Sequence, residues 1–384
     1  MSDDNFVFDR YREAIRIARP RTVRRPKHIH VRIEDDQVIA EHVRGRFTDD
    51  DFDGGVVPGF HSGFVEDNAT AQYVADVVLL HIRNVQTSFS APYIQTSDGE
   101  KKEGLPDRLV LIACSNRKQS GGNVGFKGPP PARWVPEPGL RQRIISKRSN
   151  VFSQIADAKL ADGFKKGGNR IHQRPNQELK HGPDLGGVID EQGSYLPASQ
   201  RYTGRSYAPV SAEAWKSFSG KREKLTVLIM SGLYGLIEPD ESIQEYDLHL
   251  TDTHVDTGQP VTTMWSGLFT EAVSTYVRHA YRGDRKVRIY NFLCDPHYVG
   301  AIQWQDLPKE CSVFHLASPD ADGVDLLPPA GAVLNAFLLD PGWLDRIDRD
   351  EKQYPVSDFG KAPPDYSDVR LIFESRVGLS KRQI

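Results

Sequence analysis

Asp247 and Asp295 are two carboxylates that could act directly on a substrate. A carboxylate can stabilise positive charge that develops during bond cleavage or orient an attacking water, as in glycoside hydrolysis. Asp295 has a structural alternative, because an Asp before a proline, here Pro296, commonly caps the N-terminus of a helix. Asp247 lies in an acidic loop and has the alternative of a solvated surface acid. Both roles stay open for each residue, and the place of Asp247 beside Tyr246 favours function.

Cys114 and Lys118 lie four positions apart and add a thiol and an amine. A thiolate beside a lysine or at a helix N-terminus is a nucleophile, whereas a buried, inert thiol is the more common role of a free cysteine. Lys118 is expected to bind phosphate or a carboxylate, although a lyase-type glycosylase would use such an amine. His297 is a candidate general acid or base, with an ordinary hydrogen-bonding role as its alternative. The predicted catalytic residues are Asp295, Asp247, Lys118 and Cys114.

Several tyrosines lie within or next to the loops that carry these groups. They are Tyr202, Tyr207, Tyr234, Tyr246 and Tyr298. Stacking of a base on an aromatic ring contributes roughly 1–3 kcal/mol, which helps offset the cost of flipping a nucleotide out of a duplex. Any one tyrosine can be a core residue, but five in such loops indicate a planar ligand.

The segment 231–235 contains two glycines after an apolar run. Glycine lets a backbone approach a ligand closely, and free N–H groups after a strand can hold a phosphate or a base edge. A tight structural turn explains the same glycines. With the five tyrosines, the predicted base-binding or nucleotide-binding residues are Ser115, Asn116, Gly204, Ser231, Gly232, Gly235 and His297.

Three apolar segments must position these loops. Residues 109–113, 225–230 and 287–291 are predicted to be buried strands, and each runs into one of the loops described above. Helical spacing of apolar residues over 267–281 places a helix between the last two strands, which predicts a right-handed strand–helix–strand unit. In an open α/β sheet, ligands bind outside the carboxyl ends of the strands. We therefore expect an α/β fold with a mostly parallel sheet flanked by helices and one pocket at its carboxyl edge.

The chain is expected to have three parts. Residues 1–105 form an N-terminal region with a basic arm, a hairpin over 27–43 and a helix over 71–85. Residues 106–330 form the α/β catalytic core. Residues 331–384 form a C-terminal tail, charged and Pro-containing from Trp343 onward, that is expected to wrap the surface.

Composition narrows the class of protein. Hydrophobic residues make up 38% and charged residues 26% of the 384 residues, as in ordinary globular proteins. No apolar run approaches the roughly 20 residues that span a bilayer, and residues 1–5 lack the features of a signal peptide. The three cysteines show no Cys-x-x-Cys spacing, which argues against a disulfide framework and a four-thiolate zinc site. We expect a cytoplasmic protein with no metal, no other cofactor and no obligate protein partner.

Positive charge is concentrated in two segments although the net charge is only −3. Residues 10–32 hold eight Arg and one Lys against Glu13, and residues 141–174 hold nine Lys or Arg against two acids. Such segments can neutralise phosphates and give affinity for DNA without sequence preference, with a solvated basic surface as the alternative. The predicted contacts to the DNA backbone are Arg24, Arg25, Lys147, Arg148, Lys165 and Lys166.

The segment from Ser231 to Tyr246 resembles a known family. Ser-Gly-Leu-Tyr-Gly at 231–235, Pro239 and Ile-Gln-Glu-Tyr at 243–246 are similar to the hallmark of the peroxide-stress protein YaaA family. The aromatic-x-Gly-x-x-Tyr element at 202–207, Trp265 and the segment 291–295 resemble other elements of that family. Cys-Ser-x-x-Lys at 114–118 is similar to a motif of a wider set that includes the lysine-transferring domain of archaeosine synthase. The resemblance covers roughly residues 105–300.

This resemblance implies a DNA-binding α/β protein with a basic cleft, in a set linked to 7-deazaguanine chemistry, base excision and phage-defence DNA glycosylases. One departure is clear. Where the family has Ile-Gln-Pro-Tyr-Arg, this chain has Ile-Gln-Glu-Tyr-Asp at 243–247. The chain therefore lacks the family's arginine and has two carboxylates in its place and in place of the proline. The family's helix-hairpin-helix is not recognisable.

The sequence therefore predicts an enzyme that flips a modified base out of DNA and cleaves its N-glycosidic bond, as in defence against phages with hypermodified DNA. A non-catalytic DNA-binding stress protein is one alternative, and it would have no need of Asp247 and Asp295. A nucleobase or amino-acid transferase of the archaeosine type is the other, and it would be centred on Cys114, Ser115 and Lys118.

Overall fold

The computed structural model describes residues 105–375, apart from 167–168, 171–173, 188–192, 220–223, 284, 348–352 and 361–363, together with three strands nearer the N-terminus. The chain divides into two compact units, Met1–Gly99 and Glu100–Ile384. In the first unit, β2 (His28–Glu34) and β3 (Gln37–Val43) pair as an antiparallel hairpin, and β1 (Asn5–Phe8) pairs with β3. The helix expected over 71–85 lies outside the described residues, as do Arg24 and Arg25.

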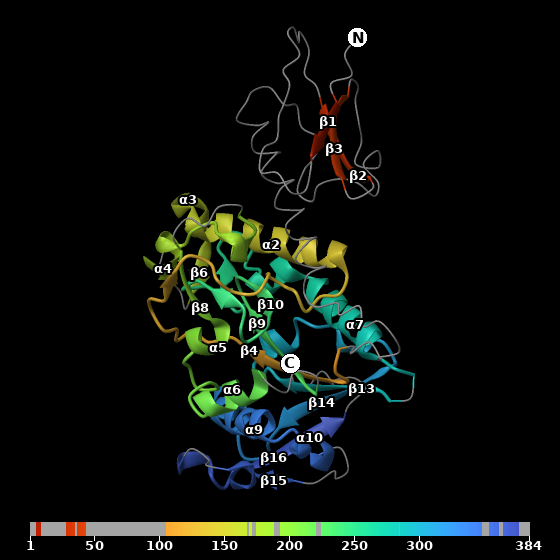
Figure 1. The fold of residues 1–384 in the computed structure, drawn as a ribbon. Coiled ribbons are helices and arrows are strands. Elements are labelled where there is room, and N and C mark those ends of the chain that lie inside the picture. The colour runs from red at the N-terminus through yellow and green to blue at the C-terminus, as the bar shows by residue number, and fades with distance from the viewer. Residues whose placement is uncertain are drawn as a thin grey trace. The chain divides into compact units, whose positions relative to one another are not determined.

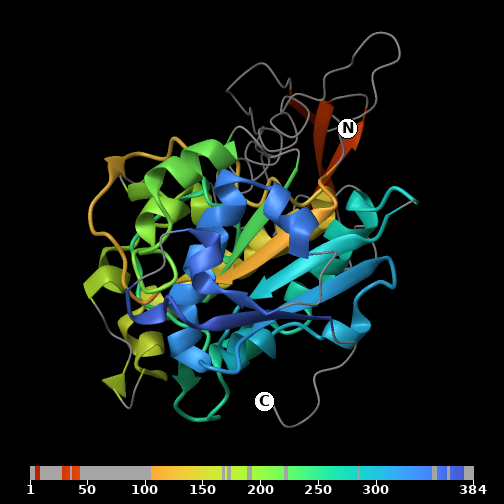
Figure 2. The same ribbon diagram turned by 90° about the horizontal axis from the view of Figure 1, so that it is seen from below.

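A seven-stranded, mostly parallel sheet organises the second unit (Figures 1 and 2). Its order is β10-β9-β4-β13-β14-β16-β15. Four strands run parallel in the middle, and β10, β15 and β16 pair antiparallel at the two sides. The bounds are β4 Arg108–Ala113, β9 Thr226–Ser231, β10 Gly235–Ile237, β13 Val287–Phe292, β14 Cys311–Ala317, β15 Tyr354–Pro355 and β16 Arg370–Ser375. Every residue of β4 and β9 is buried, as expected where helices cover both faces of a parallel sheet.

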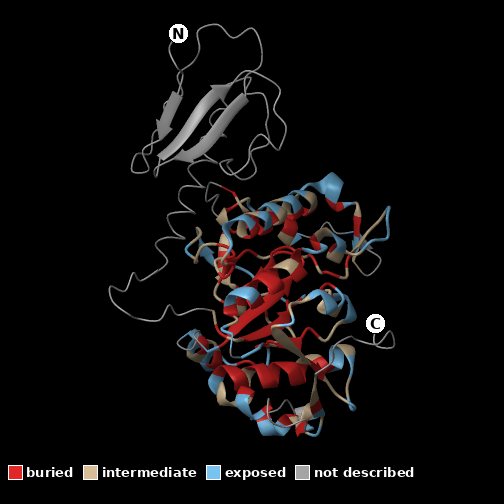
Figure 3. Ribbon diagram, turned by 90° about the vertical axis from the view of Figure 1, so that its right-hand side faces the viewer, coloured by how far each residue is buried: buried red, intermediate tan, exposed pale blue. Residues whose placement is uncertain are grey.

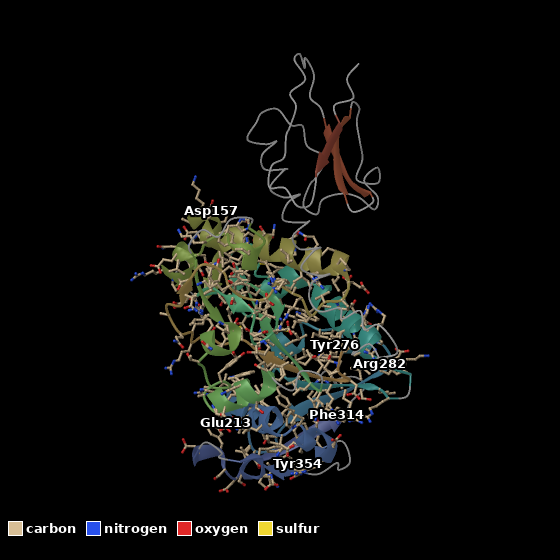
Figure 4. The ribbon with its side chains drawn as sticks, in the orientation of Figure 1. Asp157, Glu213, Tyr276, Arg282, Phe314 and Tyr354 are labelled. Carbon is tan, nitrogen blue, oxygen red and sulfur yellow. The ribbon has the colours of Figure 1, made fainter. Side chains whose placement is uncertain are left out.

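The strand–helix–strand unit predicted between 225 and 291 has parallel strands, but they do not pair with each other. β4 lies between β9 and β13, so α7 (Leu268–Ala280) crosses over β4. Tyr276, a residue of α7, is labelled in Figure 4. It fixes this crossing, because its hydroxyl donates to the Pro106 carbonyl at 2.8 Å and contacts Thr226 Oγ1 at 2.9 Å. One tyrosine on the helix thereby ties the starts of two neighbouring strands together.

Longer helices pack around the sheet, and Figure 3 shows the buried residues gathered in its central strands. α2 is Pro138–Ala156, α6 is Ala212–Ser219 and α9 is Leu327–Leu339. α6 packs on α9, ten of whose 13 residues are buried. The shorter helices are α3 Ala158–Ala161, α4 Arg174–Glu178, α5 Ala198–Arg201, α8 Pro296–Val299 and α10 Gly342–Ile347.

Two small sheets hold the long connections of the core. One has the order β11-β8-β5 and the other β12-β6-β7. The bounds are β5 Asn123–Val124, β6 Phe164–Lys166, β7 Asn169–Arg170, β8 Ser194–Pro197, β11 Ser242–Ile243 and β12 Thr253–His254. The first sheet connects the segment after β4 with the segment after β10, and the second connects the segment after α3 with residues 253–254.

The prediction that residues 331–384 only wrap the surface is wrong. α9 crosses the predicted boundary at 330, and β16 pairs with β14 inside the main sheet. Apolar side chains cause this, since Phe373 packs against Phe292 and Phe337 with ring centroids 6.2 and 6.3 Å apart. The C-terminal segment is therefore part of the core as far as Ser375.

Candidate active site

The three predicted loops meet at the carboxyl edge of the sheet. Cys114 follows β4 and continues its pairing with β9, donating its backbone N–H to the Met230 carbonyl at 2.8 Å. Its Sγ lies 3.2 Å from the hydroxyl of Tyr298, which belongs to the segment after β13. Tyr207 closes the same end of β4 by donating to the Ala113 carbonyl at 2.8 Å. The topology thus places residues from distant parts of the sequence together, as the strand-end argument predicts.

Three hydroxyl groups form a buried chain at this edge. The Tyr246 hydroxyl lies 2.9 Å from the Tyr202 hydroxyl and 2.7 Å from Ser231 Oγ. Ser231 Oγ also accepts the backbone N–H of Tyr234 at 3.0 Å. Burial raises the pKa of Tyr202 and of Tyr246 well above the usual range, so both hydroxyls stay protonated. Two of the predicted tyrosines, Tyr202 and Tyr246, are therefore fixed parts of one network rather than independent stacking platforms.

Lys118 lies against this network. Its Nζ is 4.1 Å from the ring centroid of Tyr246 and 5.8 Å from that of Tyr202, and its backbone forms an antiparallel bridge with Tyr202. The side chain is half-buried, and burial lowers the pKa of Lys118 to about 8, although Cys114 and Asp247 act in the opposite direction. Within the described residues, Nζ makes no hydrogen bond or ion pair. An appreciable fraction of this amine is therefore uncharged near neutral pH.

Asp247 is held by contacts to both its side chain and its backbone. Its Oδ1 forms an ion pair with Lys166 Nζ. Its backbone N–H donates to Asn176 Oδ1 at 2.7 Å, and its carbonyl accepts from Asn176 Nδ2 at 2.8 Å. Asn176 is fully buried in α4 and so acts as a positioning residue for the loop. Sequence reasoning missed Asn176, because nothing in the local sequence links it to a residue 71 positions away. Lys166, predicted to contact DNA, has this carboxylate as its partner.

Asp295 has the structural role that its position before a proline predicts. It is the N-cap of α8, with Pro296 following, and its Oδ1 accepts the backbone N–H of His297 at 2.8 Å. The cap engages one carboxylate oxygen of Asp295, Oδ1.

We expect Asp295→Ala to lower the free energy of unfolding by about 1 kcal/mol, and Asp295→Asn to change it little, because Asn also caps helices well. Urea denaturation measures both. If base excision is lost in Asp295→Asn while its stability is unchanged, Asp295 is more than a cap. Equal loss of stability in both variants would contradict the capping role.

His249 was not predicted to be a site residue. Its imidazole interacts electrostatically with Asp295 and Lys118. Its ring packs edge to face on Tyr298, with centroids 4.8 Å apart, and its Nδ1 lies 2.7 Å from Thr251 Oγ1. Burial lowers the pKa of His249 to about 4, although Asp295 acts in the opposite direction. The imidazole is therefore neutral at physiological pH. His249 follows the predicted site residue Asp247 by two positions, and this spacing could have identified it as a candidate from the sequence.

Tyr234 and Arg148 form part of the structural core next to the site. The Tyr234 hydroxyl donates to Asp184 Oδ2 at 2.7 Å and accepts the Gln244 N–H at 3.0 Å. Arg148 is fully buried, pairs with Glu241 and donates to the Tyr234 carbonyl at 2.8 Å. The prediction that Arg148 contacts the DNA backbone is wrong, because it lies on the buried face of α2, a regular helix that the basic composition of the segment does not reveal.

The predicted glycines serve packing. A Cβ at Gly204 would collide with Ser115 Oγ. Gly235 has φ +70°, which favours glycine, and the ring of Trp265 lies where its Cβ would be. Gly232 accepts the indole N–H of Trp265 at 2.8 Å. These contacts agree with the tight-turn alternative for the segment 231–235.

The other predicted residues stay available at the surface. Asn116, His297 and Lys165 are exposed, and Lys147 is half-buried. Across the described part of the second unit, no group of three or more His, Cys, Asp or Glu side chains could hold a metal ion. The described helices are all too short or too polar to cross a membrane.

Two cavities border the carboxyl edge. One, of about 520 Å³, is lined in part by Tyr202, Tyr207 and Trp215. The other, of about 620 Å³, includes Cys294 and His315. Cys294 has φ +58°, in the left-handed region that non-glycine residues rarely adopt, and burial raises the pKa of its thiol to about 12. The Cys294 thiol is therefore not a thiolate nucleophile at neutral pH.

The fold and this edge define an α/β protein with a lysine, a carboxylate and hydrogen-bonded tyrosines at the ends of its parallel strands. A model of the family described as peroxide stress protein YaaA matches residues 109–315, which is more than half of the chain. The chain belongs to this family. No curated protein matches the sequence.

Proposed function

We propose that this protein is an enzyme that binds DNA containing a modified base and cleaves the N-glycosidic bond of that base. One observation carries the proposal. The carboxyl edge of the sheet brings an amine, Lys118, over the ring of Tyr246, the residue that precedes Asp247 in the chain. A fixed carboxylate is the group that stabilises an oxocarbenium-like sugar, and the cations beside it suit a polyanionic substrate.

Asp247 is the better candidate for the central carboxylate. Its carboxylate is ion-paired with Lys166, and Asn176 fixes its backbone on both sides of the residue. Preorganised charge of this kind needs no rearrangement when the sugar becomes positive. Asp295 has one oxygen engaged in the α8 cap, so its role in the proposal is secondary.

The aromatic cavity of about 520 Å³ is the proposed site of the flipped base. Tyr202 belongs both to its lining and to the network beneath Lys118, and Trp215 offers a partly exposed indole. An indole such as that of Trp215 can bind any base by stacking, and a cavity of this size accommodates a base that carries a bulky substituent. Trp215 was not predicted, because its segment carries no chemical motif.

The direct test is incubation of the protein with genomic DNA from phages that carry differently modified bases. Abasic sites and released base, identified by mass spectrometry, would support the proposal. DNA binding without base release from any of these substrates would favour a non-catalytic DNA-binding protein.

The basic surface gives a separate prediction. DNA affinity should fall with rising salt, with a log–log slope of about −0.9 for each phosphate neutralised on duplex DNA. Lys147→Gln with Lys165→Gln should reduce the slope by up to about 2 and weaken binding equally on all sequences, because phosphate contacts carry no base information. Fluorescence anisotropy across a salt series measures this. A flat salt response of the wild-type protein would contradict the proposed DNA contacts.

A further inference from the structure

We propose that Lys118 also gives this protein a lyase activity, in which its amine attacks C1′ of the abasic deoxyribose and the strand is then cut on the 3′ side of that sugar. The inference rests on the proposed function, because its substrate is the sugar that base excision leaves behind. It assigns Lys118 a covalent role in place of phosphate binding.

The surroundings of Lys118 differ from those of a phosphate-binding lysine. Lys166, in the same neighbourhood, is engaged in an ion pair with Asp247. The amine of Lys118 makes no such contact within the described residues and is half-buried against the faces of Tyr246 and Tyr202. Contact with aromatic faces favours the ammonium form, whereas burial disfavours it. Burial prevails, since the pKa of Lys118 is lowered to about 8.

A lysine in this state has a lone pair available for attack. With a pKa of about 8, roughly one amine in ten is uncharged at pH 7 and half are uncharged at pH 8. A lysine at its ordinary pKa of about 10.4 is uncharged in well under one part in a thousand at pH 7. The lowered pKa therefore raises the concentration of the nucleophilic form by more than a hundredfold at pH 7.

The reaction balances without an oxidant or reductant. In the ring-opened sugar, the Lys118 lone pair forms a bond to the C1′ carbon of the aldehyde, and loss of one water, with uptake of one proton from solvent, gives an iminium. Asp247, whose charge acts on Lys118, then takes a proton from C2′. The electron pair of that C–H bond forms the C1′ enamine and expels the 3′ phosphate as the C3′–O bond breaks. Water hydrolyses the remaining imine and releases the amine.

Cys114 does not compete for this role. Its Sγ is buried and hydrogen-bonded to the Tyr298 hydroxyl at 3.2 Å. Lys118 is the more exposed of the two candidate nucleophiles, and its Nζ lies 4.1 Å from the ring centroid of Tyr246, the residue that precedes Asp247.

The test uses the full chain and an oligonucleotide duplex with one abasic site, made by enzymatic removal of a uracil. Borohydride reduces an iminium to a stable secondary amine, so it captures the covalent protein–DNA adduct. We expect an adduct whose peptide map places the DNA on Lys118. Its rate of formation should rise about tenfold from pH 6 to pH 7 and level off above pH 8, following the uncharged amine.

Lys118→Arg should abolish the adduct, because a guanidinium keeps the positive charge but stays protonated. Its DNA affinity and urea midpoint should match those of the wild type, which separates loss of the amine from loss of folding. Lys159→Arg, at an exposed amine on α3, is the matched control and should give the wild-type adduct.

Absence of an adduct with the wild-type protein, an adduct on another residue, or an adduct that survives in Lys118→Arg would overturn the inference. None of these outcomes bears on excision itself, since release of a modified base is measured separately on phage DNA. A protein that releases base without forming an adduct would be a glycosylase that uses water alone.

Discussion

Asp247→Asn should reduce the rate of base release by about 10²–10³-fold, the typical cost of removing one electrostatic stabiliser from an active site. The amide keeps the size of the side chain, and the backbone contacts to Asn176 do not depend on the carboxylate. The charge near the developing oxocarbenium ion is lost, and with it the ion pair with Lys166. Single-turnover release of the modified base, measured at saturating enzyme, reports this effect directly.

The matched control for Asp247→Asn is Glu245→Gln, which removes one negative charge from the same loop. Glu245 accepts a hydrogen bond from Ser120 at 3.1 Å on the exposed side, so its loss should leave excision nearly unchanged. DNA affinity should be retained in both variants. If Asp247→Asn and Asp295→Asn both release base at the wild-type rate, the carboxylate mechanism is wrong. Lys118 or Cys114 would then become the leading candidate for the catalytic residue.

Arg148→Met should lower the free energy of unfolding by about 3–5 kcal/mol, because it leaves the buried partner of a buried ion pair without compensation. Glu241 is 1% exposed, and Arg148 is its ion-pair partner. The substitution also removes the donor to the Tyr234 carbonyl, which lies in the turn after β9. Urea denaturation measures the loss, and a double variant with Glu241→Leu should recover part of it, because apolar residues can replace a buried pair.

Arg143→Met is the control on the same helix. Arg143 pairs with Glu271 at 2.6 Å, but the pair is solvent-exposed, so its removal should cost about 1 kcal/mol or less. An unchanged urea midpoint in Arg148→Met would contradict the stabilising role of the buried ion pair.

The sequence by itself determined the central strands and the edge at which the site lies. Strands covered by helices on both faces must be apolar throughout, so 109–113 and 225–230 could be recognised as runs without alternation. Parallel strands also place their carboxyl ends at one edge, which is why Cys114 and Tyr298 could be predicted to meet. The Asp295 cap was predictable for a local reason, since a cap and its helix are a few residues apart.

Only the tertiary structure decided which charged groups are free. Lys147 and Arg148 are adjacent and similar in sequence, yet one is half-buried beside solvent and the other is fully buried, because neighbouring positions on a helix point in different directions. Burial of Arg148 depends on Glu241, 93 residues away, and no local pattern encodes that pair.

The order of strands was decided in the same way. Placement of β4 between β9 and β13, and of β16 beside β14, follows from which apolar faces pack best over the whole sheet. The position of Asp247 likewise depends on Asn176, which contacts it only after the chain has folded. Sequence reveals which residues have useful chemistry, whereas long-range packing determines which of them remain available to a ligand.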